Sequence, residues 1–307
     1  MEAENWSDAW YHCVTLDGLG GPQLTSDRPE FWKTAADMVR IPASEFQMGD
    51  PHWNYPSRRD ERLHRAQIPE PLLVSRTEVG QALWDRVMDD NPSRFRGHDL
   101  PVDSVKWNLA VTFCNRLSEK AQLQPAYSGS GDTTHWDRAA NGFRIPTETE
   151  WEYFARGGTS TQFSTGDTLY GNQANFDIAA EYQPGNTGDK LKPATRPYLG
   201  RTTPLASYPP NPWGLHDIHG NVWEWCWDHY GTYPGGDYGD LPLGSGPDGD
   251  YGGSKAPPKA RILRGGAWGY SAYYCRSAFR GRLVPGYRYT LRVDQLGLRV
   301  IRTDPTI

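Results

Sequence analysis

Residues 216–224, "HDIHGNVWE", contain several side chains that could do chemistry. His216 and His219 are three positions apart in a predicted turn with no third ligand in view, so we expect packing or surface histidines and no metal pair. Glu224 lies between Trp223 and Trp225 in a strand-like run, where alternate side chains share a face. A carboxylate among tryptophans needs a compensating partner once it is buried.

The stretch "GYSAYYCRSAFRGRLVPGYRY", residues 269–289, is a second candidate. It holds five of the 17 tyrosines and four arginines, but no lysine, glutamate or tryptophan. Tyrosine offers a large amphipathic surface with few rotatable bonds, arginine offers a planar donor, and glycine and serine adapt their conformation. Because such residues dominate interface hot spots, the composition predicts a recognition face.

The cysteines indicate neither a zinc site nor a disulfide framework. Cys13, Cys114, Cys226 and Cys275 are far apart and form no CxxC pair. Free thiols are typical of a reducing compartment. For Cys275 we expect the usual environment of a free cysteine, which is that of a small buried hydrophobe.

The charge and the apolar pattern exclude several classes of partner. A formal net charge of -5 gives no polybasic surface, so we predict no nucleic-acid partner. The first residues are acidic and lack a secretory apolar core, and no run approaches the ~20 apolar residues of a membrane helix. We therefore expect a cytoplasmic protein without membrane insertion, with a monomer favoured and non-standard export left open.

Local patterns predict the elements that position these residues. Apolar spacing indicates helices within 77–91 and 107–121, and alternation predicts a hairpin over 38–50. In "FRIPTETEWEYFARGG", Thr147 and Glu150 form a capping box, and Gly157 supplies the left-handed stop. With 33 Gly, 25 Pro and 13 Trp, the chain should have an aromatic-rich core. It should also have long connections, at about 160–210 and 231–258.

Five motifs, "IPASEFQMGD", "FRIPTETEWEYFARGG", "PWGLHDIHGNVWEWCWD", "RILRGGAW" and "LGLRV", together resemble the formylglycine-generating-enzyme (sulfatase-modifying factor) family. The resemblance implies an α+β, C-type-lectin-like fold: a small twisted antiparallel sheet with flanking helices and long irregular loops. It assigns residues 38–302 to this domain, which leaves an N-terminal extension of 1–37 and a tail of 303–307.

The family's oxidase converts a substrate cysteine to formylglycine with two copper-binding cysteines five positions apart. Here Tyr270 stands at the first position, and Cys275 falls at the second only by counting from "RILRGGAW". One thiol cannot reproduce a two-thiolate copper site, so no copper and no enzyme activity are expected. An iron-dependent branch of the family needs a histidine-bearing N-terminal domain, for which 1–37 is too short.

The family also binds calcium, and the resemblance assigns its ligands here. Asp217 and Glu224 would offer carboxylates, while Gly220 and Val222 would offer carbonyls, a donor set that suits Ca²⁺. A second structural site would use Asn175 and Phe176, with Asp189 less certainly placed. The alternative for Glu224 is a hydrogen-bonded glutamate without metal.

The layout of 261–302 resembles the variable region of diversity-generating retroelement proteins that use this fold. In that group template adenines are randomised, and the resulting NNC codons exclude Trp, Gln, Lys, Glu and Met. Ala272, the run 275–278, Arg280 and Pro285 look constant. The candidate variable, ligand-binding positions all carry permitted residues: Gly269, Tyr270, Ser271, Tyr273, Tyr274, Phe279, Gly281, Arg282, Leu283, Val284, Gly286, Tyr287, Tyr289, Thr290 and Leu291.

The sequence thus predicts a ligand-binding protein with a diversified Tyr/Arg face that recognises an unknown protein or cell-surface ligand. Two alternatives stay open: a formylglycine-type oxidase, and a fixed carbohydrate-binding or regulatory domain. Arginines in such segments can also pair with carboxylates, as we expect for Arg276, Arg280 and Arg288.

Overall fold

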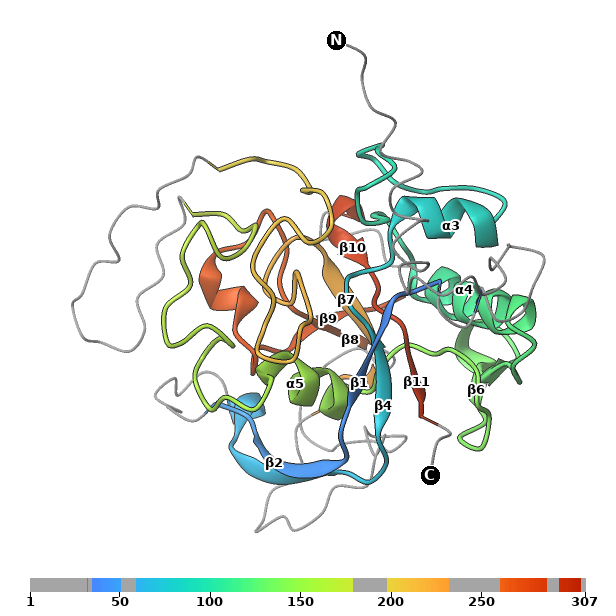
Figure 1. Cartoon of the computed structure of the whole chain (residues 1–307), viewed down its shortest axis with the longest axis horizontal. Coiled ribbons are helices and arrows are strands. Elements are labelled where there is room, and N and C mark those ends of the chain that lie inside the picture. Colours follow the sequence, from blue (N-terminus) through green and yellow to red (C-terminus); the bar gives the residue numbers. More distant parts are fainter. Residues whose placement is uncertain are drawn as a thin grey trace, which may run out of the picture.

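The computed structural model describes residues 32, 35–50, 59–178, 198–231, 260–285 and 293–304. The helices are α3 (Gln81–Val87), α4 (Trp107–Lys120) and α5 (Glu148–Arg156). The strands are β1 (Met38–Ile41), β2 (Ser44–Met48), β3 (His64–Ile68), β4 (Leu72–Ser75), β5 (Tyr127–Ser128), β6 (His135–Trp136), β7 (Trp223–His229), β8 (Arg261–Arg264), β9 (Gly281–Leu283), β10 (Leu296–Gly297) and β11 (Ile301–Thr303). This is the predicted α+β architecture, with short strands and irregular connections (Figure 1).

The largest sheet among the described residues has four strands in the order β10-β7-β8-β9. Strands β8 and β9 run antiparallel to their neighbours, whereas β10 pairs in parallel with β7. A three-stranded sheet, β1-β4-β11, joins the C-terminal strand to the N-terminal half of the chain. The expected antiparallel sheet is therefore present, with one parallel strand added at its edge.

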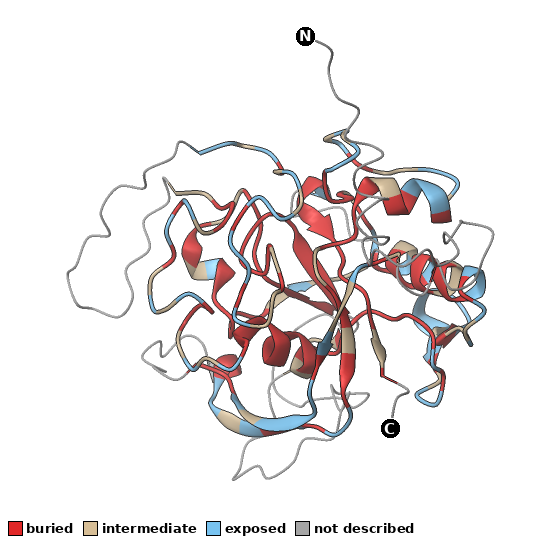
Figure 2. Ribbon diagram, in the orientation of Figure 1, coloured by how far each residue is buried: buried red, intermediate tan, exposed pale blue. Residues whose placement is uncertain are grey.

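The tryptophan-rich strand β7 lies between two apolar clusters. Trp223 and Trp225 pack with residues of α3 and α4, whereas Cys226 packs with Trp151 and Phe154 of α5. In Figure 1, α3 and α4 lie on one side of the β7–β8 pair and α5 lies on the other. The predicted alternation of faces along this strand is confirmed. Figure 2 shows that β7 and α5 are almost wholly buried, while much of β2 is exposed.

Local chemistry sets both ends of α5. The Thr147 side chain accepts a hydrogen bond from the Glu150 N–H, and the Glu150 carboxylate accepts one from the Thr147 N–H at 2.8 Å. The helix stops at Gly157, whose φ of 57° lies in the left-handed region that glycine tolerates. The predicted capping box and stop are therefore confirmed.

The predicted hairpin over 38–50 is wrong. Strand β1 pairs with β4, and β2 pairs with β3. Pro42 and Ala43 lie between β1 and β2, and proline fixes φ near about −65°, whereas a two-residue hairpin turn needs a positive φ at its first residue. The chain consequently passes from one sheet to another at this point.

Large aromatic side chains supply much of the core, as the composition predicts. Trp84, Trp107, Trp151, Trp223, Trp225 and Trp268 are all almost fully buried. Trp32 and Ala36, which precede β1, belong to the same apolar cluster as α4. No helix in the described part of the chain is long and apolar enough to cross a membrane.

Candidate functional site

The candidate face begins where β8 ends, at a tight turn of two glycines. Gly265 and Gly266 have φ values of 91° and 76°, which residues with a Cβ rarely adopt. A Cβ on Gly266 would also overlap Cys275 Sγ. The Trp268 N–H then donates to the Asn221 carbonyl at 3.0 Å, so the segment leaves the turn attached to the loop before β7.

Burial sorts the residues of this segment into two groups. Of the constant-looking positions, Ala272, 275–278 and Arg280 are buried, whereas Pro285 is partly exposed. Among the ten candidate variable positions that the structure describes, only Ser271 and Phe279 are buried. Tyr274 and Arg282 are exposed, and six others are partly exposed: Gly269, Tyr270, Tyr273, Gly281, Leu283 and Val284. Gly286, Tyr287, Tyr289, Thr290 and Leu291 lie outside the described residues, as does Arg288.

The aromatic residues of the segment form one cluster with Trp223 of β7. The Tyr274 ring lies 5.1, 5.3 and 4.9 Å from those of Tyr270, Tyr273 and Phe279. Trp223 contacts Tyr270 and Phe279 from below, at 5.3 and 5.9 Å. These tilted and edge-to-face contacts are the favoured arrangements for aromatic pairs. We call these five residues the aromatic cluster; it holds partly exposed tyrosines on a buried base.

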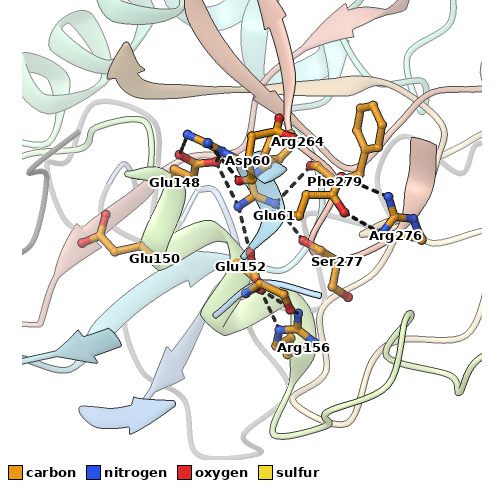
Figure 3. Close-up of polar contacts among 12 residues, drawn as sticks. Asp60, Glu61, Glu148, Glu150, Glu152, Arg156, Arg264, Arg276, Ser277 and Phe279 are labelled. Carbon is orange, nitrogen blue, oxygen red and sulfur yellow. Dashed lines mark hydrogen bonds and ion pairs between the residues drawn. The ribbon is translucent and has the colours of Figure 1, made fainter. Parts of the chain in front are cut away.

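Beneath the segment, four buried arginines pair with four buried carboxylates, and we call this group the arginine scaffold (Figure 3). Its members are Arg156, Arg264, Arg276 and Arg280 with Asp50, Glu61, Glu148 and Glu152. Figure 3 labels all of them except Arg280 and Asp50. Arg276 binds Glu61 through two nitrogens at 2.7 and 3.0 Å, and Arg280 binds Glu148 at 2.6 and 2.8 Å. The expected pairing of these two arginines with carboxylates is confirmed.

The arginine scaffold also fixes the backbone of the segment. Arg264 donates from β8 to the carbonyls of Ser277 and Phe279, at 2.8 and 3.1 Å, and to the Glu152 carboxylate at 2.9 Å. Burial alone would raise the pKa of Glu152, but Arg156 and Arg264 outweigh it and hold that pKa below its usual value. The carboxylate therefore stays ionised, and both guanidinium groups have a partner.

Cys275 is the buried packing residue that we expected. Its side chain is fully buried in a cluster with Phe163, Leu169 and Ala272. Burial raises the pKa of the thiol far above its ordinary value, which keeps it in the unreactive neutral form. Cys114 and Cys226 are likewise free and buried.

The predicted calcium residues lie in a loop that is adjacent to the candidate face. Asp217, Gly220 and Asn221 all have φ between 55° and 91°, so the loop 217–224 turns through left-handed backbone. The Gly220 N–H donates to the Gly265 carbonyl at 2.7 Å. Asn175, from the second predicted site, accepts the Asn221 N–H at 2.8 Å, so the structure brings the two predicted sites together. Phe176 is buried beside them.

The two carboxylates of this loop have different environments. Glu224 is bound by Arg299 at 2.9 to 3.1 Å and by the Trp151 indole N–H at 2.7 Å, so the compensating partner that it needs is an arginine. Asp217 accepts a hydrogen bond from the Ala206 N–H through one oxygen, whereas its other oxygen is buried without a hydrogen-bond partner. Burial raises the pKa of Asp217 to about 6.

Sequence reasoning missed a third carboxylate at this loop. Glu78 is buried and accepts from the Asn221 side chain at 2.7 Å and from the Val222 N–H at 3.0 Å. Burial, Asp217 and Glu224 raise its pKa well above the usual value. The contact spans 143 positions in the chain, so no local pattern points to it.

Three carboxylates lie near a single guanidinium at this loop. Glu78, Asp217 and Glu224 face one guanidinium, that of Arg299, and one carboxylate oxygen of Asp217 has no hydrogen-bond partner. Within the described residues no three His, Cys, Asp or Glu side chains converge as metal ligands. A cation here would therefore take backbone carbonyls as well, as Ca²⁺ readily does.

Both histidines of "HDIH" are packing residues, as predicted. His219 is buried, and its Nε2 accepts from the Ser164 N–H at 3.0 Å while its Nδ1 donates to the Cys275 carbonyl at 2.8 Å. Burial lowers the pKa of His219 to about 4, so the ring is neutral at pH 7. The Nδ1 of His216 contacts the Tyr208 carbonyl at 2.8 Å.

Comparison with known proteins bears on both resemblances. Residues 24–304 match the family described as "Sulfatase-modifying factor enzyme 1-like domain". The chain is 38% identical over 275 residues to the formylglycine-generating enzyme of Streptomyces coelicolor, covering 79% of this chain and 82% of that protein. It is 32% identical over 253 residues to the chaperone protein LppX of Paenibacillus barcinonensis, covering 76% and 80%.

Among solved structures, that of Treponema denticola variable protein 1 has a TM-score of 0.67 and 30% identity, covering 87% of this chain and 95% of that one. These matches confirm the predicted C-type-lectin-like fold of the formylglycine-generating-enzyme type and the resemblance to the variable proteins that share it. The family contains enzymes and also members named inactive, such as a bovine protein 27% identical to this chain over 226 residues, 63% of this chain and 71% of that protein.

Proposed function

The chain belongs to the sulfatase-modifying factor enzyme 1-like family, and we propose that it is a non-enzymatic, ligand-binding member whose face around Tyr274 recognises a protein or cell-surface ligand. The similarity to a variable protein of the same fold favours diversification at this face. A diversified face must change its contacts without changing the fold, because each new sequence has to fold on the same scaffold.

One observation carries the proposal: within a single segment, the constant-looking positions other than Pro285 are buried, whereas eight of the ten described candidate variable positions keep exposed surface. The side chains that hold the segment, such as Arg276 and Arg280, are buried and paired. Most of the described candidate positions retain exposed surface. Substitutions at exposed positions away from such pairs usually change stability by about 0.5 kcal/mol or less. The face can therefore vary while the scaffold stays fixed.

The aromatic cluster supports recognition energetically. Tyr274 is 37% exposed yet is held by three neighbouring rings, so it loses little conformational freedom on binding. Rigid tyrosines of this kind are typical anchors in binding faces.

Calcium has a structural part in this proposal. Asp217, Glu224 and the carbonyls of Gly220 and Val222 would hold one Ca²⁺ next to the turn that leads into the face, and Asn175 and Phe176 would belong to a second, adjacent site. The support is the partnerless oxygen of Asp217 and the position of three carboxylates beside one guanidinium. Bound Ca²⁺ would stabilise this turn and would supply no chemistry.

The first test is genetic. The 3′ end of the gene and its flanking DNA would be sequenced from several isolates, with changes tabulated over codons 261–302. We expect substitutions confined to the candidate positions, a nearby near-copy with adenines at those codons, and a reverse transcriptase gene. An invariant segment without such a copy would contradict diversification.

An oxidase is the second candidate, because the chain is 38% identical to a formylglycine-generating enzyme. The test is copper binding and turnover of a cysteine-containing peptide by the wild-type chain, with Cys275→Ser as the matched variant. We expect neither turnover nor tight copper binding. Turnover that Cys275→Ser abolishes would replace our proposal with the oxidase.

A further inference from the structure

Side chains from outside the variable segment contact Trp268, which directly precedes Gly269, the first candidate variable position. Trp268, two residues before Tyr270, contacts Phe95 edge to face at 5.7 Å and lies 6.3 Å from Tyr198. Gly269, itself a candidate variable position, lies beside Tyr198: a Cβ at this position would be 3.7 Å from the Tyr198 hydroxyl, and 2.1 Å from the side-chain nitrogen of Gln295, which would have to move. Tyr198 therefore borders the candidate face at position 269.

This neighbouring surface is apolar and exposed. Tyr198, Leu199 and Val293 have exposed fractions of 41%, 43% and 58%. Val293 precedes Asp294, whose carbonyl accepts the indole N–H of Trp268 at 3.3 Å. We call Phe95, Tyr198, Leu199, Arg201 and Val293 the constant flank, because none of them is a candidate variable position.

The constant flank also carries positive charge. The exposed guanidinium of Arg201 lies 5.5 Å from the Phe95 ring centre, and that of Arg94 lies 5.3 Å from the same centre. Arg94 pairs with Asp294, whereas Arg201 has no carboxylate partner among the described residues. On the other side of the segment, Arg282 of β9 lies over Tyr230 at 4.3 Å, also without a carboxylate among the described residues.

We propose that the constant flank is a fixed part of the binding face, and that it docks an acidic polypeptide segment whatever the variable positions select. Leu199, Tyr198 and Val293 would cover apolar side chains of the partner, and Arg201 would pair with a carboxylate. Arginine suits this role because its planar group binds a carboxylate through two parallel hydrogen bonds. The inference rests on the proposed function, since it adds a constant half to the same face.

The test uses the full chain with Tyr270, Tyr273, Tyr274, Arg282, Leu283 and Val284 randomised. Binders would be selected separately against serum albumin, an acidic protein, and lysozyme, a basic one. Several binders of each target would then receive Arg201→Ala or Leu199→Ala. Arg138→Ala is the matched control for the first, because Arg138 is exposed and lies 4.6 Å from a tryptophan ring centre. Leu63→Ala, at 41% exposed, is the matched control for the second.

We expect Arg201→Ala to weaken albumin binders by about tenfold and lysozyme binders by less than about twofold. Leu199→Ala should weaken binders of both targets by roughly threefold or more. If neither variant exceeds its control in most binders, the constant flank is not part of the face, while the proposed function stands. If the randomised chains keep their melting temperature but yield no binder to either target, the proposed function fails and this inference fails with it.

Discussion

The arginine scaffold and the loop 217–224 are both buried and both charged, but only the scaffold is balanced. Four arginines meet four carboxylates beneath the candidate face. At the loop, Glu78, Asp217 and Glu224 share Arg299. Buried charge is costly unless it is paired, so the first region is complete in itself, whereas the second has three carboxylates beside one guanidinium. The two regions therefore differ in their charge balance.

The largest expected effect is the loss of one arginine from the scaffold. Arg276→Ala should lower the free energy of unfolding by about 3–5 kcal/mol, because the buried carboxylates of Glu61 and Asp50 would lose the guanidinium that pairs with them. Urea denaturation of both proteins measures the change, with the exposed Arg282→Ala as the matched control. A loss below about 1 kcal/mol would show that the scaffold does not hold the segment.

Calcium should act on the unbalanced region alone. At about 100 times its dissociation constant, Ca²⁺ should add about 2.7 kcal/mol to the free energy of unfolding, seen as a melting temperature several degrees higher than in chelator. Mg²⁺ should do less, since it prefers strict octahedral geometry and keeps its waters. Asp217→Asn should abolish the shift, whereas Asp89→Asn, at an exposed position, should leave it intact. An unchanged melting temperature in the wild type would remove calcium from the proposal.

A pH titration should detect the raised pKa of Asp228, a buried carboxylate close to Glu148 of the arginine scaffold. Burial and Glu148 raise the pKa of Asp228 to about 6. The folded protein therefore binds more protons than the unfolded chain between about pH 4 and 6, and this residue's contribution makes the free energy of unfolding fall as pH rises through that window. Asp228→Asn keeps an oxygen that can accept the Glu148 N–H, and it should flatten the fall by on the order of 1–3 kcal/mol. An unchanged pH profile would contradict this assignment.

The smallest effects should come from the face itself. Arg282→Ala should change the free energy of unfolding by no more than about 0.5 kcal/mol, because this exposed guanidinium contacts a ring and no described carboxylate. Tyr274→Ala should lose about 1 kcal/mol through its three ring contacts. Thermal melts of the two variants check both values. Losses as large as that of Arg276→Ala would erase the distinction between face and scaffold.

The features that the sequence predicted correctly depend on interactions between residues that are close together in the chain. The cap at Thr147, the stop at Gly157 and the alternating faces of β7 all depend on neighbours within a few residues or on one strand. The pairing of β1 with β4 and the contact of Glu78 with Val222 join distant positions, so no short pattern contains them. The constant flank could not be predicted from the sequence for the same reason, because only folding brings Phe95 and Tyr198 beside Trp268.

The pairing of β7 with both β8 and β10 has a consequence for chain length. Arg264 and Gly297 both pair with Glu224, so the two ends of the variable segment meet at one residue of the sheet. The segment is therefore a closed loop of roughly thirty residues, and doubling its length would cost only about 0.6 kcal/mol of closure entropy. A gain or loss of codons that leaves Arg276, Arg280 and the pairing of β9 with β8 in place should therefore cost little stability, so the face can differ in size as well as in sequence.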